Sequence, residues 1–156
     1  MTNKNFPPQF FSEKDGVILN KDNYHIPNFT FKENNKRYNA ENPKKLAGCR
    51  LKIDGAFYDS TNGKKCDNGL LLEDNRFYLI ELKGDDVNKG CQQLLNTLAL
   101  LEKDCPKEKF DFYCRIIGAT GVPKNSVYRL KLEKILHSTS KNKKFISGVN
   151  NFSEKV

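Results

Sequence analysis

The chain has 156 residues, and its 27 Lys and Arg against 19 Asp and Glu give a formal net charge of +8. This length fits one domain, and the basic balance favours a polyanionic partner or an acidic surface without choosing among nucleic acid, membrane and acidic protein. The sequence has no run of about 18 to 20 apolar residues and no apolar signal-peptide core at its N-terminus, so we expect a cytoplasmic protein without a membrane span.

Cysteine and histidine offer no obvious site. The five cysteines are odd in number, and no two of them form a Cys-x-x-Cys pair. This pattern argues against a zinc site and against a disulfide framework. The two histidines, His25 and His137, lie far apart and have no partner at metal-ligand spacing.

Residues 1–45 are rich in Asn, Lys, Phe and Pro and show no sustained hydrophobic period. Pro7, Pro8, Pro27 and Pro43 interrupt regular elements in this region. We expect an irregular arm with one or two short elements. Its aromatic side chains are expected to pack back onto a sheet, and stacking on nucleic-acid bases is the alternative.

Three strands are predicted between residues 49 and 83. Residues 49–58 alternate, with Leu51 and Ile53 on one face and Arg50 and Lys52 on the other. Turn-forming residues at 59–63 lead to a second strand at 65–72, and those at 73–75 lead to a third strand at 77–83. The simplest arrangement of the three is an antiparallel meander.

A helix and a fourth strand follow the meander. Asp85 and Asp86 offer a helix N-cap, apolar residues recur at helical spacing from Val87 to Leu101, and Pro106 ends the pattern. Residues 110–118 read as a strand that returns to the same sheet through a crossover connection. A short strand or helix is expected around residues 128–136.

These elements define an α/β fold class with a mixed four- to five-stranded sheet and flanking helices. We divide the chain into an irregular N-terminal arm (1–45), a core (46–136) and a basic C-terminal tail (137–156). The three segments are expected to form a single domain overall.

Glu81-Leu82-Lys83, at the end of the third predicted strand, is the main candidate for chemistry. The two charged side chains project to one side of an otherwise apolar strand. On the triplet alone, a solvated ion pair on an edge strand is the alternative interpretation. If the second and third strands pair, Asp67 lies beside Glu81, with the backbones about 5 Å apart. Two carboxylates this close repel unless a cation lies between them, and Mg²⁺ suits such a pair.

Asp67 on the second strand, Glu81-x-Lys83 on the third, and the helix and strand that follow resemble the PD-(D/E)xK nuclease superfamily. That family has a restriction-endonuclease-like core in the order αβββαβ, and the resemblance covers about residues 45–118. It implies an endo- or exonuclease that uses Mg²⁺, with Mn²⁺ as a substitute. Asp67, Glu81 and the main-chain carbonyl of Leu82 would bind the metal, and Lys83 would position the attacking water.

Many members of this family also carry a glutamine on the helix after the motif. Gln92 and Gln93 occur at the matching place, and Gln93 lies four residues before Thr97 on one polar stripe. We favour Gln93 as a catalytic-site residue. A solvated helix flank is the alternative for both glutamines.

Further acids are candidates for the same site. Family members often have a glutamate on the first helix, for which Glu41 and Glu33 are the candidates here. Asp54 is another candidate acid, with a salt-bridged position near a turn as its alternative. Cys66 stands where the family often has proline before the aspartate, which is a loosely kept position.

The basic residues near the motif are expected to neutralise phosphates of nucleic acid, with DNA favoured over RNA and no membrane partner. The residues meant are Arg50, Lys52, Lys64 and Lys65. Two alternatives stay open: a catalytically inactive nuclease-like module that binds nucleic acid or protein, and an inhibitor or immunity-type protein. A homodimer and a subunit of a larger complex are both compatible with the sequence.

Overall fold

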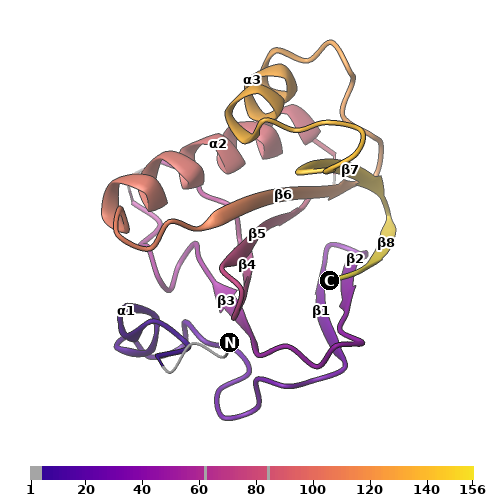
Figure 1. Cartoon of the computed structure of the whole chain (residues 1–156). Coiled ribbons are helices and arrows are strands. Elements are labelled where there is room, and N and C mark those ends of the chain that lie inside the picture. The colour runs from indigo at the N-terminus through magenta and orange to yellow at the C-terminus, as the bar shows by residue number, and fades with distance from the viewer. Residues whose placement is uncertain (1–4, 62, 84) are drawn as a thin grey trace.

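The computed structural model describes residues 5–61, 63–83 and 85–156. Within them the chain is mixed α/β, with one sheet of five strands and one of three (Figure 1). The elements, in chain order, are α1 (Gln9–Ser12), β1 (Asn28–Glu33), β2 (Lys36–Glu41), β3 (Gly48–Lys52), β4 (Asn68–Leu72), β5 (Arg76–Leu82), α2 (Val87–Asp104), β6 (Asp111–Gly118), α3 (Val127–Leu136), β7 (Phe145–Val149) and β8 (Asn151–Lys155).

The five-stranded sheet has the order β3-β4-β5-β6-β7. Strands β3, β4 and β5 pair antiparallel, which confirms the predicted meander, and β5, β6 and β7 run parallel. The parallel neighbours β5 and β6 are joined through α2, as the crossover prediction requires. The predicted mixed sheet of four to five strands is therefore confirmed.

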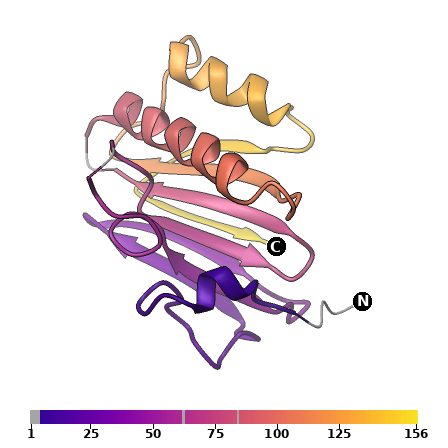
Figure 2. The ribbon, with the colours of Figure 1, turned by 90° about the vertical axis from the view of Figure 1, so that its left-hand side faces the viewer.

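Helix α2 covers one face of this sheet, together with α3 (Figure 1). The side chain of Asp86 caps the helix by accepting a hydrogen bond from the N–H of Lys89 at 3.0 Å. The apolar stripe of α2 packs in one buried cluster with Phe77 and Leu79 of β5. Each leucine side chain buried there contributes about 1.5 to 3 kcal/mol. In Figure 2, α2 and α3 lie together at the top of the view, and α1 lies near the bottom.

The three-stranded sheet covers the opposite face. Strands β1 and β2 form an antiparallel hairpin, and β8 pairs parallel with β2. Phe29, Phe31 and Tyr38 of the hairpin share a second buried cluster with Ile80 and Leu82 of β5. The central strand β5 is therefore buried on both faces, which explains why its sequence reads as a nearly continuous apolar run.

Both ends of the chain carry more regular structure than the sequence predicted. The arm at 1–45 contains a regular hairpin, and the supposed tail at 137–156 contains β7 and β8. Strand β7 buries Phe145 against the α2 face, whereas the side chains of β8 are exposed or half-buried. A polar edge strand such as β8 gives little local hydrophobic signal, and its parallel partner lies more than 100 residues earlier in the chain.

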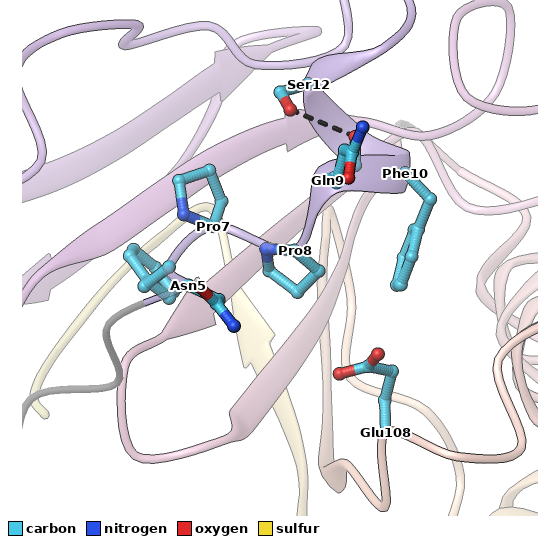
Figure 3. A pocket seen from close by; sticks show the side chains of 8 residues that line it. Asn5, Pro7, Pro8, Gln9, Phe10, Ser12 and Glu108 are labelled. Atoms are coloured by element: carbon cyan, nitrogen blue, oxygen red, sulfur yellow. Dashed lines mark hydrogen bonds between the residues drawn. The ribbon is translucent and has the colours of Figure 1, made fainter.

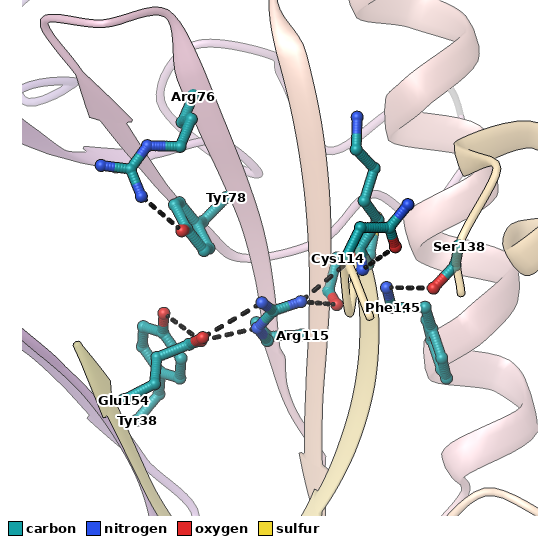
Figure 4. Close-up of polar contacts among 10 residues, drawn as sticks. Tyr38, Arg76, Tyr78, Cys114, Arg115, Ser138, Phe145 and Glu154 are labelled. Carbon is teal, nitrogen blue, oxygen red and sulfur yellow. Dashed lines mark hydrogen bonds and ion pairs between the residues drawn. The ribbon is translucent and has the colours of Figure 1, made fainter. Parts of the chain in front are cut away.

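An ion pair between Arg115 and Glu154 connects the two sheets (Figure 4). Arg115 on β6 is only 2% exposed. It donates from Nε to Oε2 of Glu154 at 2.6 Å and from Nη2 to Oε1 at 3.1 Å. The hydroxyl of Tyr38 donates to the same carboxylate at 2.8 Å, and the guanidinium lies 5.3 Å from the ring centre of Tyr78. This contact fastens β8, and with it the hairpin, to the five-stranded sheet.

Among the described residues, no helix combines the length and the apolar character needed to cross a lipid bilayer.

Candidate active site

Asp67 and Glu81 lie next to the same residue pair of the β4–β5 ladder. The register pairs Asn68 with Ile80; Asp67 precedes Asn68 on one chain segment, and Glu81 follows Ile80 on the other. The main-chain N–H of Asp67 donates a hydrogen bond to Oε2 of Glu81 at 3.2 Å. The structure thus brings together the two acids that the sequence pattern selected.

Glu81 is a buried acid on a central strand. Its side chain is 1% exposed and points to the α2 face, where a Cβ at Gly90 would lie 3.4 Å from its Cγ. The pKa of Glu81 is raised to about 9, first by burial of the carboxyl group and second by the nearby Asp67 carboxylate, while Lys83 acts in the opposite direction. Because β5 lies between β4 and β6, the alternative of a solvated ion pair on an edge strand is wrong.

Glu33 joins this acid pair from the other sheet. It is the last residue of β1, and its carboxyl group is close enough to the Asp67 carboxyl group to interact with it electrostatically. Partial burial raises the pKa of Glu33, and the nearby Asp67 carboxylate raises it further, while Lys52 and Lys83 lower it. We call Glu33, Asp67 and Glu81 the acid cluster.

Glu41 does not belong to the acid cluster, so its prediction as an additional acid is corrected. It lies at the other end of the hairpin, because Glu41 pairs with Asn28 whereas Glu33 pairs with Lys36. Its side chain accepts a hydrogen bond from the hydroxyl of Ser153 at 3.3 Å. The role expected from a first helix is thus available only to Glu33, which comes from a strand.

The main-chain carbonyl of Leu82 faces the turn of the same hairpin. The Nδ2 of Asn34 lies 3.5 Å from this carbonyl oxygen. The next residue, Lys83, is anchored through its main-chain N–H, which donates to the carbonyl of Ile117 at 2.8 Å. Lys83 is half-buried and interacts electrostatically with Glu81 and Glu33. The hairpin turn, the Leu82 carbonyl and the acid cluster therefore lie together.

Gln93 of α2 contacts the segment that leads into β4. It is 6% exposed, so the alternative of a solvated flank is wrong for it. Its Nε2 donates to the carbonyl of Lys65 at 3.1 Å, and the hydroxyl of Thr97 accepts from the N–H of Cys66 at 2.8 Å. Both contacts hold the backbone that leads into Asp67. The buried Oε1 of Gln93 has no hydrogen-bond partner among the residues that the structure describes.

Two of the four predicted phosphate-binding residues are used inside the protein. Lys65 is 2% exposed, and its Nζ donates to the carbonyls of Asp59 and Gly63 at 2.8 and 2.9 Å. Arg50 is half-buried, with its guanidinium 5.0 Å from the ring centre of Phe31 in the layer between the sheets. The prediction for Lys65 is wrong, and Arg50 has a packing role.

Lys52 and Lys64 are exposed beside the acid cluster. Lys52 interacts with Glu33, and Lys64 interacts with Lys83 and with Lys89 at the start of α2. Lys89 is not among the site residues predicted from the sequence, although its place in the first turn of the predicted helix could have indicated it.

Asp54 lies near the acid cluster without joining it. It follows β3 at a turn, and its carboxylate acts electrostatically on Lys64. Its Oδ1 is buried and has no hydrogen-bond partner within the described ranges. It therefore adds negative charge and a free oxygen next to the site.

The donor set of the site fits a hard divalent cation. The described residues contain no group of three or more His, Cys, Asp and Glu side chains arranged to hold a metal ion. Asp67, Glu81 and the Leu82 carbonyl nevertheless offer only oxygen atoms, as Mg²⁺ prefers, and such an ion keeps several waters. A cation beside Glu81 would also offset the burial of its charged form.

A separate cavity of about 620 Å³ lies at the other end of α2 (Figure 3). It is lined by residues 5–10, Ser12 and Glu108. Glu108 follows the C-terminus of α2. Gly90, which lies next to Glu81 of the acid cluster, belongs to the N-terminal half of the helix. Since α2 has 18 residues, it is about 27 Å long. This cavity is therefore distinct from the acid cluster.

No protein-family model, no curated protein and no solved structure matches this chain.

Proposed function

We propose that the protein is a metal-dependent nuclease with a restriction-endonuclease-like core, which hydrolyses phosphodiester bonds of nucleic acid, DNA being favoured over RNA. The observation that carries this proposal is the convergence of Glu33, Asp67 and Glu81 from both sheets, with Lys83 beside them.

The burial of Glu81 supports a functional role for the acid cluster. Its carboxyl group is almost fully buried, and within the described residues it accepts a single hydrogen bond, from the main-chain N–H of Asp67. Burying an acid beside another acid costs stability that an apolar side chain at this place would not cost. Perturbed acids of this kind are concentrated at catalytic sites.

A bound divalent cation, Mg²⁺ or Mn²⁺, would be held by Asp67, Glu81 and the Leu82 carbonyl and would supply Lewis-acid stabilisation of the phosphate and acidification of a water. Lys83 holds that water through its ammonium group and neutralises charge on the phosphate. Glu33 accepts the proton of the water, because its raised pKa makes its carboxylate a stronger base than an ordinary glutamate. Gln93 keeps Asp67 in place through the backbone of Lys65.

Cleavage assays test this proposal. Plasmid DNA, single-stranded DNA and RNA are incubated with the protein in Mg²⁺ or Mn²⁺, and Glu81→Ala is compared with the wild type. Glu102→Ala is a matched control, because Glu102 is an exposed glutamate on α2. The proposal requires cleavage of at least one substrate that Glu81→Ala loses and Glu102→Ala keeps. Equal cleavage by Glu81→Ala, or no cleavage of any substrate, would refute it.

The raised pKa of Glu81 also favours a second candidate, a nuclease-like module that binds nucleic acid without cutting it. A group whose pKa is about 9 is largely protonated at neutral pH, so the acid cluster carries less negative charge than its residue types suggest. Salt-sensitive binding without turnover in any metal would support this candidate over the nuclease.

A further inference from the structure

Three polar side chains on one side of α2 bind the chain segment that leads into Asp67. The three are Gln93, Asn96 and Thr97. Their spacing of three and four residues makes them neighbours on the helix surface. Each of them bonds to a main-chain group, and the three groups belong to successive residues. They are the carbonyl of Lys64 for Asn96, at 3.1 Å, the carbonyl of Lys65 for Gln93, at 3.1 Å, and the N–H of Cys66 for Thr97, at 2.8 Å. We call these three contacts the α2 clamp.

Thr97 is the most constrained member of the clamp, because its side chain is fully buried. Its hydroxyl donates to the carbonyl of Gln93, four residues earlier, at 2.8 Å. The hydroxyl proton is therefore used within the helix, and the oxygen is left to accept the N–H of Cys66. Cys66 is also fully buried, so its N–H could not turn to water if the hydroxyl were removed.

The main chain of Asp67 itself is held on both sides. Its N–H donates to Oε2 of Glu81 at 3.2 Å, and its carbonyl accepts from the N–H of Ile53 at 2.9 Å. Together with the α2 clamp, these bonds hold a main-chain group of each residue from 64 to 67. The backbone position of Asp67 is therefore set by its contacts with Glu81, with Ile53 and with α2.

The same helix also contacts Glu81. A Cβ at Gly90 would lie 3.4 Å from Cγ of Glu81, so this side chain rests against the helix. Gly90 precedes Gln93 by three residues and Thr97 by seven, which places all three on one side of α2. One side of α2 therefore contacts both Glu81 and the segment before Asp67.

We propose that Thr97 is a positioning residue for the divalent cation, because through the α2 clamp it holds Asp67 at the separation from Glu81 at which both carboxylates reach one ion. This inference rests on the proposed nuclease function. Thr97 acts through the main chain and contacts neither the ion nor the substrate. Ligands that hydrogen bonds already hold in place lose less freedom when the ion binds, so the affinity for the ion is higher.

Binding of Mn²⁺ alone, followed by electron paramagnetic resonance, tests this role without turnover. Thr97→Val removes the hydroxyl and keeps the branched shape of the side chain, whereas Thr97→Ser keeps the hydroxyl. We expect Mn²⁺ binding to be about 10- to 100-fold weaker in Thr97→Val and within about threefold of the wild type in Thr97→Ser.

Asn96→Ala tests the clamp from an exposed position, where a substitution does not disturb the core. It should also weaken Mn²⁺ binding. Leu101→Val is the control for lower stability, because Leu101 is a buried core residue one turn beyond Thr97 on α2 and is not part of the clamp. Its affinity for Mn²⁺ should equal that of the wild type.

Amide hydrogen exchange in the metal-free protein provides a second measurement. The N–H of Cys66 should exchange faster in Thr97→Val than in Thr97→Ser, since only the serine variant keeps the acceptor for this group. Unchanged exchange at Cys66 in Thr97→Val would contradict the clamp.

Equal affinity for Mn²⁺ in Thr97→Val and the wild type would overturn the inference and leave the proposed function standing. An equal loss in Leu101→Val would also overturn it, because lower stability would then be the cause. A wild-type protein that binds no Mn²⁺ and cleaves no substrate would overturn both the inference and the proposed function.

Discussion

Glu81 accepts a hydrogen bond from the main-chain N–H of Asp67 at 3.2 Å, across the pair β4 and β5. This contact is the structural basis of the proposed site, because it fixes the side chain of one acid to the backbone of the other. The contact uses the main chain of Asp67, and the Asp67 side chain interacts electrostatically with Glu33.

Glu81→Gln is expected to change how stability depends on pH. The folded-state pKa of Glu81 is about 9, against 4.5 for an ordinary glutamate side chain. Between these values the folded protein holds a proton that the unfolded chain has lost, so this group's contribution to stability is complete below about pH 4.5 and falls as pH rises toward 9. Glutamine keeps the shape of the neutral acid and does not titrate.

Urea unfolding of wild type and Glu81→Gln at pH 5, 7 and 9 measures this effect without added metal. The stability advantage of the glutamine variant should grow with pH, by at most about 1.4 kcal/mol per pH unit. An advantage that stays constant from pH 5 to pH 9 would show that Glu81 is ionised in the folded protein throughout.

Gly48→Ala is expected to weaken the packing of the hairpin on the five-stranded sheet. A Cβ at Gly48 would lie 2.4 Å from Cζ of Phe29 and within 3.0 Å of two further atoms of its ring. Overpacking against a rigid ring costs about 1 to 3 kcal/mol. Gly121→Ala is a control for the added methyl group, because the new Cβ would lie 3.7 Å from its nearest neighbour, a serine hydroxyl oxygen. Gly121 differs from Gly48 in lying in a loop.

Thermal unfolding and cleavage rates of both variants test whether the hairpin matters for chemistry. Because Glu33 reaches the acid cluster from the hairpin, Gly48→Ala should lose activity as well as stability. If Gly48→Ala is as stable and as active as Gly121→Ala, the close contact with Phe29 does not position the hairpin.

Arg115→Met is expected to be strongly destabilising. It removes the cation that pairs with Glu154 and leaves the carboxylate with the hydroxyl of Tyr38 as its hydrogen-bond donor among the described residues. Breaking a buried ion pair by removing one partner costs about 3 to 5 kcal/mol, whereas replacing both partners by apolar residues is often close to neutral. The double variant Arg115→Met/Glu154→Leu should therefore recover most of the loss in chemical denaturation. A double variant as unstable as Arg115→Met would contradict this account.

Much of the five-stranded sheet could be predicted because its signals are local. The apolar run at Phe77–Leu82 and the helical spacing from Val87 to Leu101 are visible within single elements. Strands β1 and β2 also alternate, with Phe29 and Phe31 on the buried face, but Asn and Lys residues around them obscured the pattern. Strand β8 is defined by a long-range parallel pairing, which local periodicity cannot show.

The part of the candidate site that depends on local sequence could also be predicted. Asp67 and Glu81 follow from the register of a single β-hairpin. The choice between Glu33 and Glu41 depends on how the β1–β2 hairpin docks on a sheet formed later in the chain, so spacing could not decide it. Lys64 and Lys65 are neighbours of the same residue type, and only the folded loop shows that the second one is buried.

Lys65→Met is expected to separate the structural role of this lysine from nucleic-acid binding. The variant loses two hydrogen bonds from a charged donor to main-chain carbonyls, which costs about 1 to 3 kcal/mol. Its salt dependence of DNA binding should equal that of the wild type, whereas Lys64→Met should show a smaller slope. Thermal unfolding and binding titrations measure both effects. A reduced slope in a fully folded Lys65→Met protein would restore Lys65 as a phosphate contact.

The most direct test of the central claim compares two glutamates of the hairpin. Glu33→Gln removes a carboxylate from the acid cluster, and Glu41→Gln removes one from the opposite end of the same hairpin. Initial rates of metal-dependent DNA cleavage should fall by about 100-fold or more in Glu33→Gln. They should stay within about twofold of the wild type in Glu41→Gln, since a half-exposed acid outside the site stabilises no transition state. Equal rates in the two variants would contradict a site built from Glu33, Asp67 and Glu81.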